Sequence, residues 1–234
     1  TIAKRIIDSI DLIKLNLNNI LELGINDCLI NSFLEKNFSN SNIDHADICS
    51  SKSVNYESSQ FLEIDLNNLN LKNNFYDLIY SNYFLHLTDS FERNLGVIFN
   101  SLRSNSFFIG AIPDKDSMFQ ILNSMYETDL LLYNGVYQRN NPTLEIENIL
   151  LILKKYKFDI PTIYSDTFTI DYLLFENLLL DIKKMNTSYC HLDKKRGFES
   201  KKYIDNLKNY YQNKYFKKEF ILDIKINIIS AWKK

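Results

Sequence analysis

Hydrophobic residues follow two different spacings in the first half of the chain. Near the start, Ile2, Ile6, Ile10 and Ile13 recur at every third or fourth position, which predicts an amphipathic helix. Shorter, mostly apolar runs come next, and stretches with helical spacing separate them. Strands buried on both faces have such continuous apolar runs, so the alternation predicts a parallel sheet covered by helices. The predicted strands are NNILELG (18–24), NIDHADI (42–48), QFLEIDL (60–66), YDLIYSNYFLHL (76–87) and SFFIGAIP (106–113).

A helix is predicted before the fifth strand, over residues 89–105. Asp89 or Ser90 is expected to cap its start. The residues expected on its apolar face are Phe91, Leu95, Ile98 and Leu102.

The pattern changes after Pro113, where helical spacing becomes dominant. Two further strands are predicted, at 159–172 and 220–234, and the last one alternates apolar and polar residues. Its expected apolar set is Ile221, Ile224, Ile226 and Ile228. Helices are predicted over 116–135, 143–158, 173–186 and 200–216. The chain has no internal repeat and no linker rich in Pro, Gly or Ser, so we expect a single domain.

Composition and charge exclude several classes of protein. The net charge of −2 gives no basic field for nucleic acid, and the lysines near the end alternate with acids and aromatic residues as on a solvated face. No run approaches the roughly 18 apolar residues of a membrane span, and the first residues are too charged for a signal peptide. Three widely spaced cysteines are typical of a reducing compartment.

Polar side chains stand at the carboxyl ends of successive predicted strands, where an open parallel sheet binds its ligand. Glu22 and Gly24 end the first strand, Asp47 ends the second and Asp65 ends the third. A carboxylate at the end of the second strand can accept hydrogen bonds from two ribose hydroxyls. A carboxylate at the end of the third strand can accept a hydrogen bond from the adenine amino group. The fourth segment adds Ser81, Asn82, Tyr83 and His86. This order suits a cofactor that contains adenosine.

Several of these segments resemble motifs of S-adenosylmethionine-dependent methyltransferases. They are ILELG, ADI, FYDLIYSNYFLHL and FFIGAIP in the first half of the chain. Beyond this generic core, FIGAIPDKDSMFQI, FDIPTIYSDTFTIDY, LLLDIKKMNTSYC and ISAWKK resemble one group of that superfamily. The group holds the malonyl-carrier-protein methyltransferase of biotin synthesis and the methyltransferase-like assembly factor of respiratory complex I. The C-terminal half is closer to the assembly-factor branch.

The resemblance implies an α/β Rossmann-like methyltransferase fold. We therefore expect a mostly parallel seven-stranded sheet with an antiparallel last strand and helical insertions after strands five and six. The single domain 1–234 would divide into a cofactor-binding half, 1–113, and a substrate-side half, 114–234.

The resemblance also assigns cofactor-binding roles to particular residues. The first motif of the family falls on Glu22, Gly24, Asn26 and Cys28. The acid that binds the ribose falls on Asp47, and the acid on the adenine side falls on Asp65. The segment after strand four falls on Ser81, Leu85, His86 and Leu87. The family has glycine where this chain has Asn26 and Cys28. Asn tolerates positive φ, but a cysteine that needed it would be strained by about 1–3 kcal/mol. Asp27 also places negative charge near the cofactor's carboxylate. S-adenosylmethionine is the expected cofactor, with loss of its binding as the alternative.

Other candidate residues each have two interpretations. His86, with Tyr83, is a catalytic candidate, or it supports the cofactor loop. Asp114 and Asp116 contact substrate or cap the next helix. Among the arginines (Arg103, Arg139 and Arg196), Arg139 is the best candidate to bind a malonyl carboxylate. Tyr126, Tyr133 and Tyr137 line a substrate cavity or pack in the core, and the adjacent Cys190 and His191 are not expected to bind metal.

Two functions follow from these observations. The first is a methyltransferase that acts on a malonyl thioester or on a protein side chain. The second is a complex I assembly factor that binds protein as a scaffold or hydroxylates an arginine. An acyl-carrier protein or a respiratory subunit is the expected partner. The expected compartment is the cytoplasm of a bacterium or the mitochondrial matrix of a eukaryote.

Overall fold

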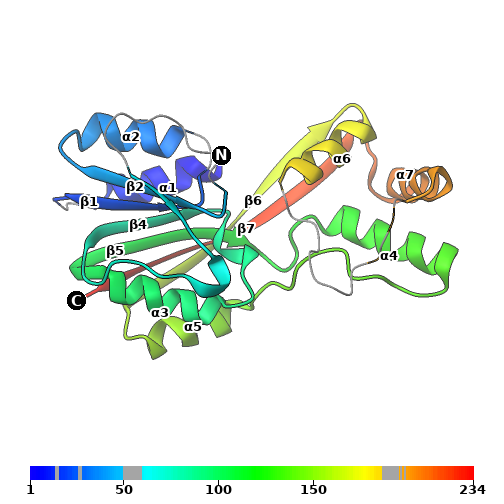
Figure 1. The fold of residues 1–234 in the computed structure, drawn as a ribbon. Helices are drawn as coiled ribbons and strands as arrows, with labels where there is room; N and C mark the ends of the chain where they lie inside the picture. Colours follow the sequence, from blue (N-terminus) through cyan, green and yellow to red (C-terminus); the bar gives the residue numbers. More distant parts are fainter. Residues whose placement is uncertain (14–15, 26–27, 50–59, 186–194, 196, 198) are drawn as a thin grey trace. The chain divides into compact units, whose positions relative to one another are not determined.

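A seven-stranded sheet organises the chain, in the order β3-β2-β1-β4-β5-β7-β6 (Figure 1). This computed structural model describes residues 1–234 except 14–15, 26–27, 50–59, 186–194, 196 and 198. Neighbouring strands from β3 to β5 pair in parallel, and β7 pairs antiparallel with β5. The strands are β1 (Asn19–Leu23), β2 (Asn42–Asp47), β3 (Phe61–Glu63), β4 (Tyr76–Asn82), β5 (Leu102–Pro113), β6 (Asp159–Tyr172) and β7 (Phe220–Lys233). The predicted Rossmann-like sheet with an antiparallel last strand is confirmed.

Seven α-helices accompany the sheet in the described part of the chain. They are α1 (Ile2–Asp11), α2 (Leu29–Asn37), α3 (Phe91–Ser101), α4 (Phe119–Tyr133), α5 (Ile146–Lys155), α6 (Phe175–Lys184) and α7 (Lys201–Tyr215), and two short 3-10 helices, η2 (Leu66–Asn68) and η3 (Leu85–Leu87), flank β4. The expected insertions are present, with α4 and α5 after β5 and with α6 and α7 after β6. No described helix is long and apolar enough to cross a membrane.

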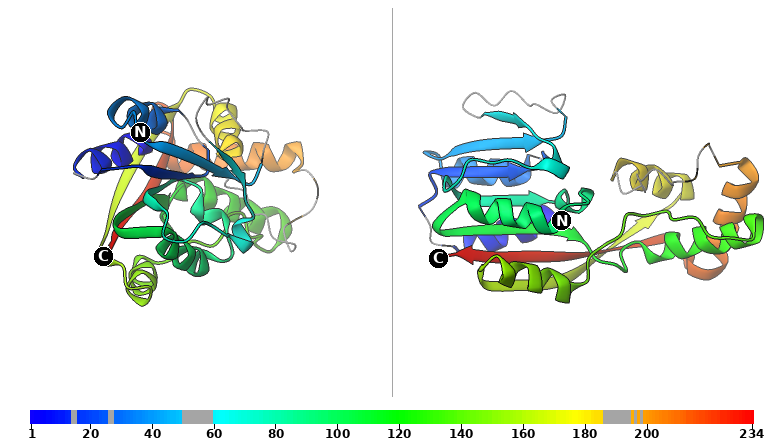
Figure 2. Two further views of the ribbon diagram at one scale, coloured as in Figure 1. Left: turned by 60° about the vertical axis from the view of Figure 1, so that its left-hand side comes forward. Right: turned by 60° about the horizontal axis from the view of Figure 1, so that its bottom comes forward.

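The chain forms two compact units, and β6 and β7 contribute residues to both. Unit 1 comprises residues 1–114, 144–166 and 226–234, and unit 2 comprises 115–143 and 167–225. In unit 1, α1 and α2 cover one face of the sheet and α3 and α5 cover the other (Figures 1 and 2). In unit 2, α4 packs against α7. The division of the chain into a cofactor-binding half and a substrate-side half stays a prediction.

Three details of the predicted elements are corrected by the structure. The strand predicted over 76–87 ends at Asn82, because Tyr83 has φ of +56° and cannot continue an extended strand. Leu102 is buried as the first residue of β5 rather than as part of α3. Ile221 is partly exposed while Leu222 is fully buried, so the inward positions of β7 start on the even-numbered residues.

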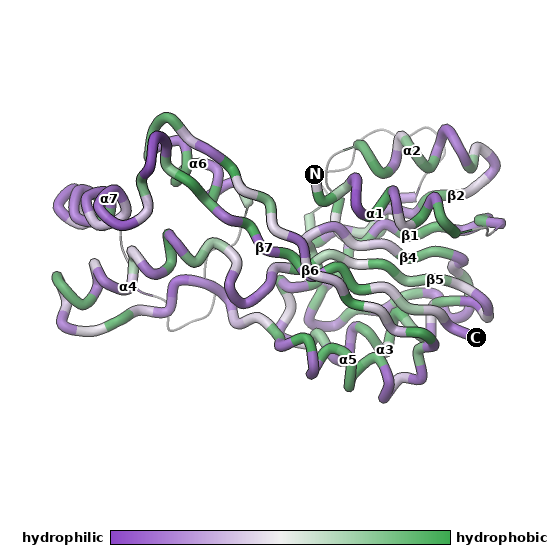
Figure 3. The backbone as a smooth tube through the Cα atoms, turned by 180° about the vertical axis from the view of Figure 1, so that it is seen from behind, coloured by the Kyte–Doolittle hydropathy of each residue, from purple (hydrophilic) through white to green (hydrophobic). Residues whose placement is uncertain are grey.

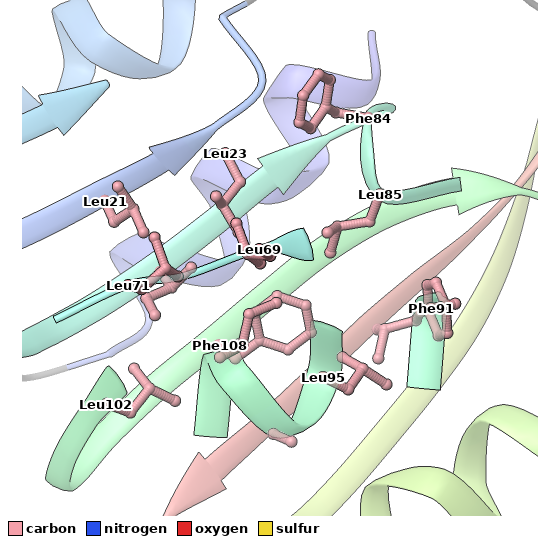
Figure 4. Close-up of a cluster of buried hydrophobic side chains, with 14 of the residues drawn as sticks. Leu21, Leu23, Leu69, Leu71, Phe84, Leu85, Phe91, Leu95, Leu102 and Phe108 are labelled. Atoms are coloured by element: carbon pink, nitrogen blue, oxygen red, sulfur yellow. The ribbon is translucent and has the colours of Figure 1, made fainter. Parts of the chain in front are cut away.

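One large buried cluster of unit 1 lies between the sheet and the helices α3 and α5. Hydrophobic residues are concentrated along β5 and β7, whereas α7 in unit 2 is mostly hydrophilic (Figure 3). Leu21 and Leu23 of β1 meet Leu95 of α3 and Phe108 of β5 in one buried cluster (Figure 4). Burying one side chain of this size contributes about 1.5–3 kcal/mol to the free energy of unfolding. The cluster fixes the carboxyl ends of β1 and β4, where the predicted site residues lie.

Candidate functional site

The first predicted cofactor residue, Glu22, is held inside the sheet by a histidine. Glu22 on β1 lies opposite His45 on β2, and the Glu22 Oε2 atom is 2.6 Å from Nδ1 of His45. Both side chains are almost completely buried. A buried carboxylate needs such a partner, because an isolated buried charge is costly. The pair therefore anchors β1 to β2 directly below the predicted cofactor edge, and His45 is a residue that the sequence analysis missed.

Asp47, the predicted ribose acid, closes the same edge. Its side chain is 0% exposed, and its Oδ2 atom accepts a hydrogen bond from the backbone N–H of Ile25 at 2.9 Å. One residue earlier, the N–H of Gly24 donates to the carbonyl of Ala46 at 2.8 Å. These bonds tie the segment after β1 to the end of β2. Asp47 thus lies where the sequence predicts it, and its carboxylate supports the backbone of the loop.

Gly24 itself adopts a conformation that favours glycine. Its φ is +86°, and a Cβ atom built there would lie only 2.2 Å from Cγ of Phe84. Cys28, by contrast, has φ of −74° at the start of α2 and is exposed. The strain considered for a cysteine at this position is therefore absent. Asn26 and Asp27 lie outside the described residues.

Ser81 and Asp65, the other predicted cofactor residues, make local hydrogen bonds. The Ser81 hydroxyl, fully buried on β4, donates to the carbonyl of Leu23 at 2.9 Å. Asp65 is exposed, and its Oδ1 atom accepts from the backbone N–H of Asn67 at 2.9 Å, which caps η2. Ser81 therefore joins β4 to β1, while Asp65 presents its carboxylate to solvent at the β3 end. Their contacts with a cofactor stay a prediction.

The two catalytic candidates follow β4. The ring centroids of Tyr83 and His86 are 4.7 Å apart in an edge-to-face arrangement. Burial lowers the pKa of His86 to about 4, so the imidazole is neutral at pH 7. A base with so low a pKa is weak at neutral pH. Both ring nitrogens of His86 are buried without a hydrogen-bond partner among the described residues, so no hydrogen bond is seen through which His86 supports the cofactor loop. Its low pKa disfavours proton abstraction at neutral pH.

The predicted substrate residues occupy different units. Asp114, in unit 1, accepts a hydrogen bond from the Asn227 amide at 3.0 Å. Asp116, in unit 2, lies 3.7 Å from the Lys225 ammonium group. The first turn of α4 starts after Met118, so neither aspartate occupies the cap position that the capping interpretation requires.

Arg139, in unit 2, is already paired with two carboxylates. It contacts both oxygens of the fully buried Asp129, and its Nη1 atom is 2.7 Å from Glu199. Burial opposes its charge, but the hydrogen bonds to Asp129 and Glu199 outweigh this effect and raise its pKa. Binding of a third carboxylate by this guanidinium stays a prediction. The other candidate cations are Arg103, which pairs with Asp77 at 3.1 Å, and Arg196, which lies outside the described residues, as do Cys190 and His191.

The predicted tyrosines take part in packing within unit 2. Tyr133 stacks on Tyr203 with 6.0 Å between ring centroids and lies edge-to-face with Tyr137. Its hydroxyl donates to Glu199, and the Tyr126 hydroxyl lies 3.1 Å from the side-chain oxygen of Asn140. These contacts match the interpretation of the tyrosines as packing residues.

Comparisons of sequence find relatives among mitochondrial arginine hydroxylases. The arginine-hydroxylase NDUFAF5 of Dictyostelium discoideum is 27% identical over 125 residues, which are 53% of this chain and 28% of that protein. The human protein of the same name is 24% identical over 127 residues, 54% of this chain and 37% of that protein. The match thus spans well under half the length of these curated relatives. No protein-family model matches the sequence.

Comparisons of structure find methyltransferases. A methyltransferase of Bacillus halodurans, itself described as putative, has a TM-score of 0.65 at 10% identity, covering 99% of this chain and 98% of that one. A phosphoethanolamine N-methyltransferase of Haemonchus contortus, solved with S-adenosylhomocysteine, has a TM-score of 0.53 at 11% identity, covering 99% of this chain and 52% of that one. At such identities the likeness establishes the fold. The resemblance to methyltransferases is confirmed at the level of the fold, and the resemblance to the assembly-factor branch is confirmed by the sequence matches over about half of this chain.

Proposed function

We propose that this chain binds S-adenosylmethionine at the carboxyl edge of the unit 1 sheet and modifies a protein side chain. The observation that carries the proposal is the register of Glu22, Asp47 and Asp65 at the ends of β1, β2 and β3. In a parallel sheet of this order, the carboxyl ends of the strands form the ligand edge. When bound, the cofactor supplies an electrophilic methyl group.

The donor set at this edge matches the chemistry of an adenosine cofactor. The exposed Asp65 carboxylate is available to an amino group of the base, and Asp47 stands at the strand end expected for the ribose hydroxyls. The backbone segment after Gly24 leads into the start of α2, where the positive end of the helix favours a carboxylate. These residues would hold the cofactor's adenosine and methionine ends.

The choice of a protein side chain as acceptor rests on the relatives and on Arg139. The curated relatives are named arginine hydroxylases, so we propose arginine as the acceptor residue. A malonyl thioester has less support, because Arg139, the cation predicted for its carboxylate, is already neutralised by Asp129 and Glu199. The relatives' names also extend the proposal to a mitochondrial location. From the resemblance to the assembly-factor branch, we propose a respiratory subunit as substrate and the matrix as compartment.

A second candidate is a protein-binding scaffold that has lost the cofactor. One observation favours it: Phe84 fills the space that the missing side chain of Gly24 would otherwise leave open to a ligand. The binding experiment below separates the two candidates.

Calorimetric titration with S-adenosylmethionine and S-adenosylhomocysteine tests the proposal. We expect binding by the wild-type chain, and a loss of about 10- to 100-fold in affinity for Asp47→Asn, because a hydrogen bond to a charged group contributes about 1.5–3 kcal/mol. Asp44→Asn is the matched control, since Asp44 lies on the same strand, is 9% exposed and accepts a hydrogen bond from the Tyr76 hydroxyl away from the edge.

Two outcomes would contradict this proposal. Equal affinities for wild type and Asp47→Asn would show that the ligand binds elsewhere, and no binding at millimolar cofactor would favour the scaffold. The acceptor is tested separately by mass spectrometry of respiratory subunits from cells with and without the protein. An arginine that gains a methyl group only in its presence would support the proposed substrate. An arginine that gains only an oxygen atom would contradict methyl transfer, because the methyl group of the cofactor supplies no oxygen.

A further inference from the structure

Phe84 lies in direct contact with the Cα atom of Gly24. A Cβ atom built on Gly24 would be 2.2 Å from Cγ, 2.4 Å from Cβ and 2.5 Å from Cδ2 of Phe84. Carbon atoms in normal contact are about 3.5–4.0 Å apart. The space that the missing side chain of Gly24 leaves open is therefore filled by a residue of the chain itself.

The local backbone directs Phe84 into this position. Tyr83 has φ of +56°, an unfavourable conformation for a bulky residue, and its N–H donates to the carbonyl of Ala111 at 2.9 Å. The chain then turns into η3, where the N–H of Leu87 donates to the carbonyl of Phe84 at 3.0 Å. The turn after β4 thus points the Phe84 ring inward, and Figure 4 shows it at the end of that strand.

The Phe84 ring is also well packed. Only 5% of the residue is exposed, and it belongs to the buried cluster that includes Leu23 and Leu85. Moving the ring into solvent would forfeit this burial. This packing therefore favours the position of the ring beside Gly24.

A glycine in a loop after the first strand of such a sheet normally lets a ligand approach the backbone closely. Here the approach to Gly24 is made by Phe84, while the neighbouring Ile25 is itself buried and hydrogen-bonded to Asp47. A cofactor that approaches Gly24 from the side of its missing side chain must displace the ring.

The geometry points to Phe84 as an internal plug that competes with S-adenosylmethionine for the space beside Gly24. This inference rests on the proposed function, because it assigns a control of affinity to the same edge of the sheet. The plug keeps the edge closed until the ring moves, so cofactor binding is coupled to a change in the turn at Tyr83 and Phe84. The free energy needed to displace the ring is subtracted from the favourable binding free energy, so the apparent affinity for S-adenosylmethionine is lower.

Removing the ring tests the plug directly. We expect Phe84→Ala to bind S-adenosylmethionine and S-adenosylhomocysteine about 10- to 100-fold more tightly than wild type in calorimetric titrations of the full chain. Phe91→Ala is the matched control, because Phe91 is buried to a similar extent in the same cluster but lies on α3. Its affinity should stay within about twofold of wild type, since loss of core packing alone does not open the edge.

Phe84→Leu keeps an apolar side chain in the cluster and guards against misfolding of the alanine variant. It should give an intermediate gain in affinity. Far-UV circular dichroism and urea unfolding of each variant confirm that the binding data come from folded protein.

The outcomes separate the plug from the proposed function. If wild type binds and both Phe84 variants bind equally or more weakly, the plug is wrong and the proposed function stands. If only the Phe84 variants bind, the plug stands and the native chain is a scaffold with a closed site. If no variant binds at millimolar cofactor, both ideas fall, because opening the edge reveals no site.

Discussion

At the scale of single residues, Gly24 shows how one position can have two explanations. A glycine after the first strand indicates a cofactor loop, but its φ of +86° and its contact with Phe84 already require glycine in this fold. The presence of glycine at position 24 is therefore explained by the fold itself. It is evidence for cofactor binding only together with other observations. Farther along the loop, Cys28 replaces a glycine of the family but has φ of −74°, an angle that does not require glycine.

Substituting Gly24 should test the contact with Phe84. We expect Gly24→Ala to lower the free energy of unfolding by about 2–5 kcal/mol, from left-handed backbone strain and overpacking. Combining it with Phe84→Ala should cost less than the two single losses together, because the clash is removed and only the backbone strain remains. Urea unfolding measures all three variants. Gly135→Ala is the control, because a Cβ atom built on Gly135 would lie 4.0 Å from the nearest atom, the carbonyl oxygen of Tyr133. An equal loss of unfolding free energy for Gly135→Ala would contradict the argument.

His86 should make stability depend on pH in a defined direction. Its pKa is about 4 in the folded chain against 6.5 ordinarily, so between these values only the unfolded chain binds the proton. The stabilising effect is complete above about pH 6.5 and is lost as the pH falls toward 4. The free energy of unfolding should therefore fall more steeply for wild type than for His86→Gln over this window. Parallel curves from urea unfolding would show that His86 titrates normally.

At the scale of elements, most helices and strands follow from periodicity, and the errors lie where elements end. The predicted strand 159–172 coincides with β6, because Pro161 near its start and polar alternation mark it locally. The end of β4 could not be predicted, since the turn at Tyr83 depends on a hydrogen bond to Ala111 on a neighbouring strand. Non-local bonds of this kind leave no periodic signal in the sequence.

The segment after α4 is held by Arg139, which links Asp129 of that helix to Glu199 before α7. Arg139→Met should lower the free energy of unfolding by about 3–5 kcal/mol, because it leaves the buried Asp129 carboxylate without its cation. Adding Asp129→Asn should recover part of this loss. Lys208→Met removes the more exposed pair with Glu176 and should cost about 0–1 kcal/mol. Equal losses for the two single variants in urea unfolding would contradict a buried role for Arg139.

At the scale of the whole molecule, the chain divides its candidate residues between two units. The sheet edge with Asp47, Ser81 and His86 belongs to unit 1, whereas Arg139 and its tyrosines belong to unit 2. Unit 2 is built from two separate stretches of chain, 115–143 and 167–225, which meet through α4 and α7. Sequence spacing cannot reveal this division, because residues far apart along the chain form each unit.

The sequence by itself determined the fold class, the order of helices and strands, and the polar residues at the ends of the parallel strands. These features depend on local periodicity and on residue type, which one chain displays directly. Only the tertiary structure decided what each polar group contacts: Glu22 meets His45, Asp47 meets Ile25, and Arg139 meets two carboxylates. The contact between Phe84 and Gly24 was likewise visible only in the tertiary structure. The two residues are 60 positions apart, and no local sequence pattern records such a contact.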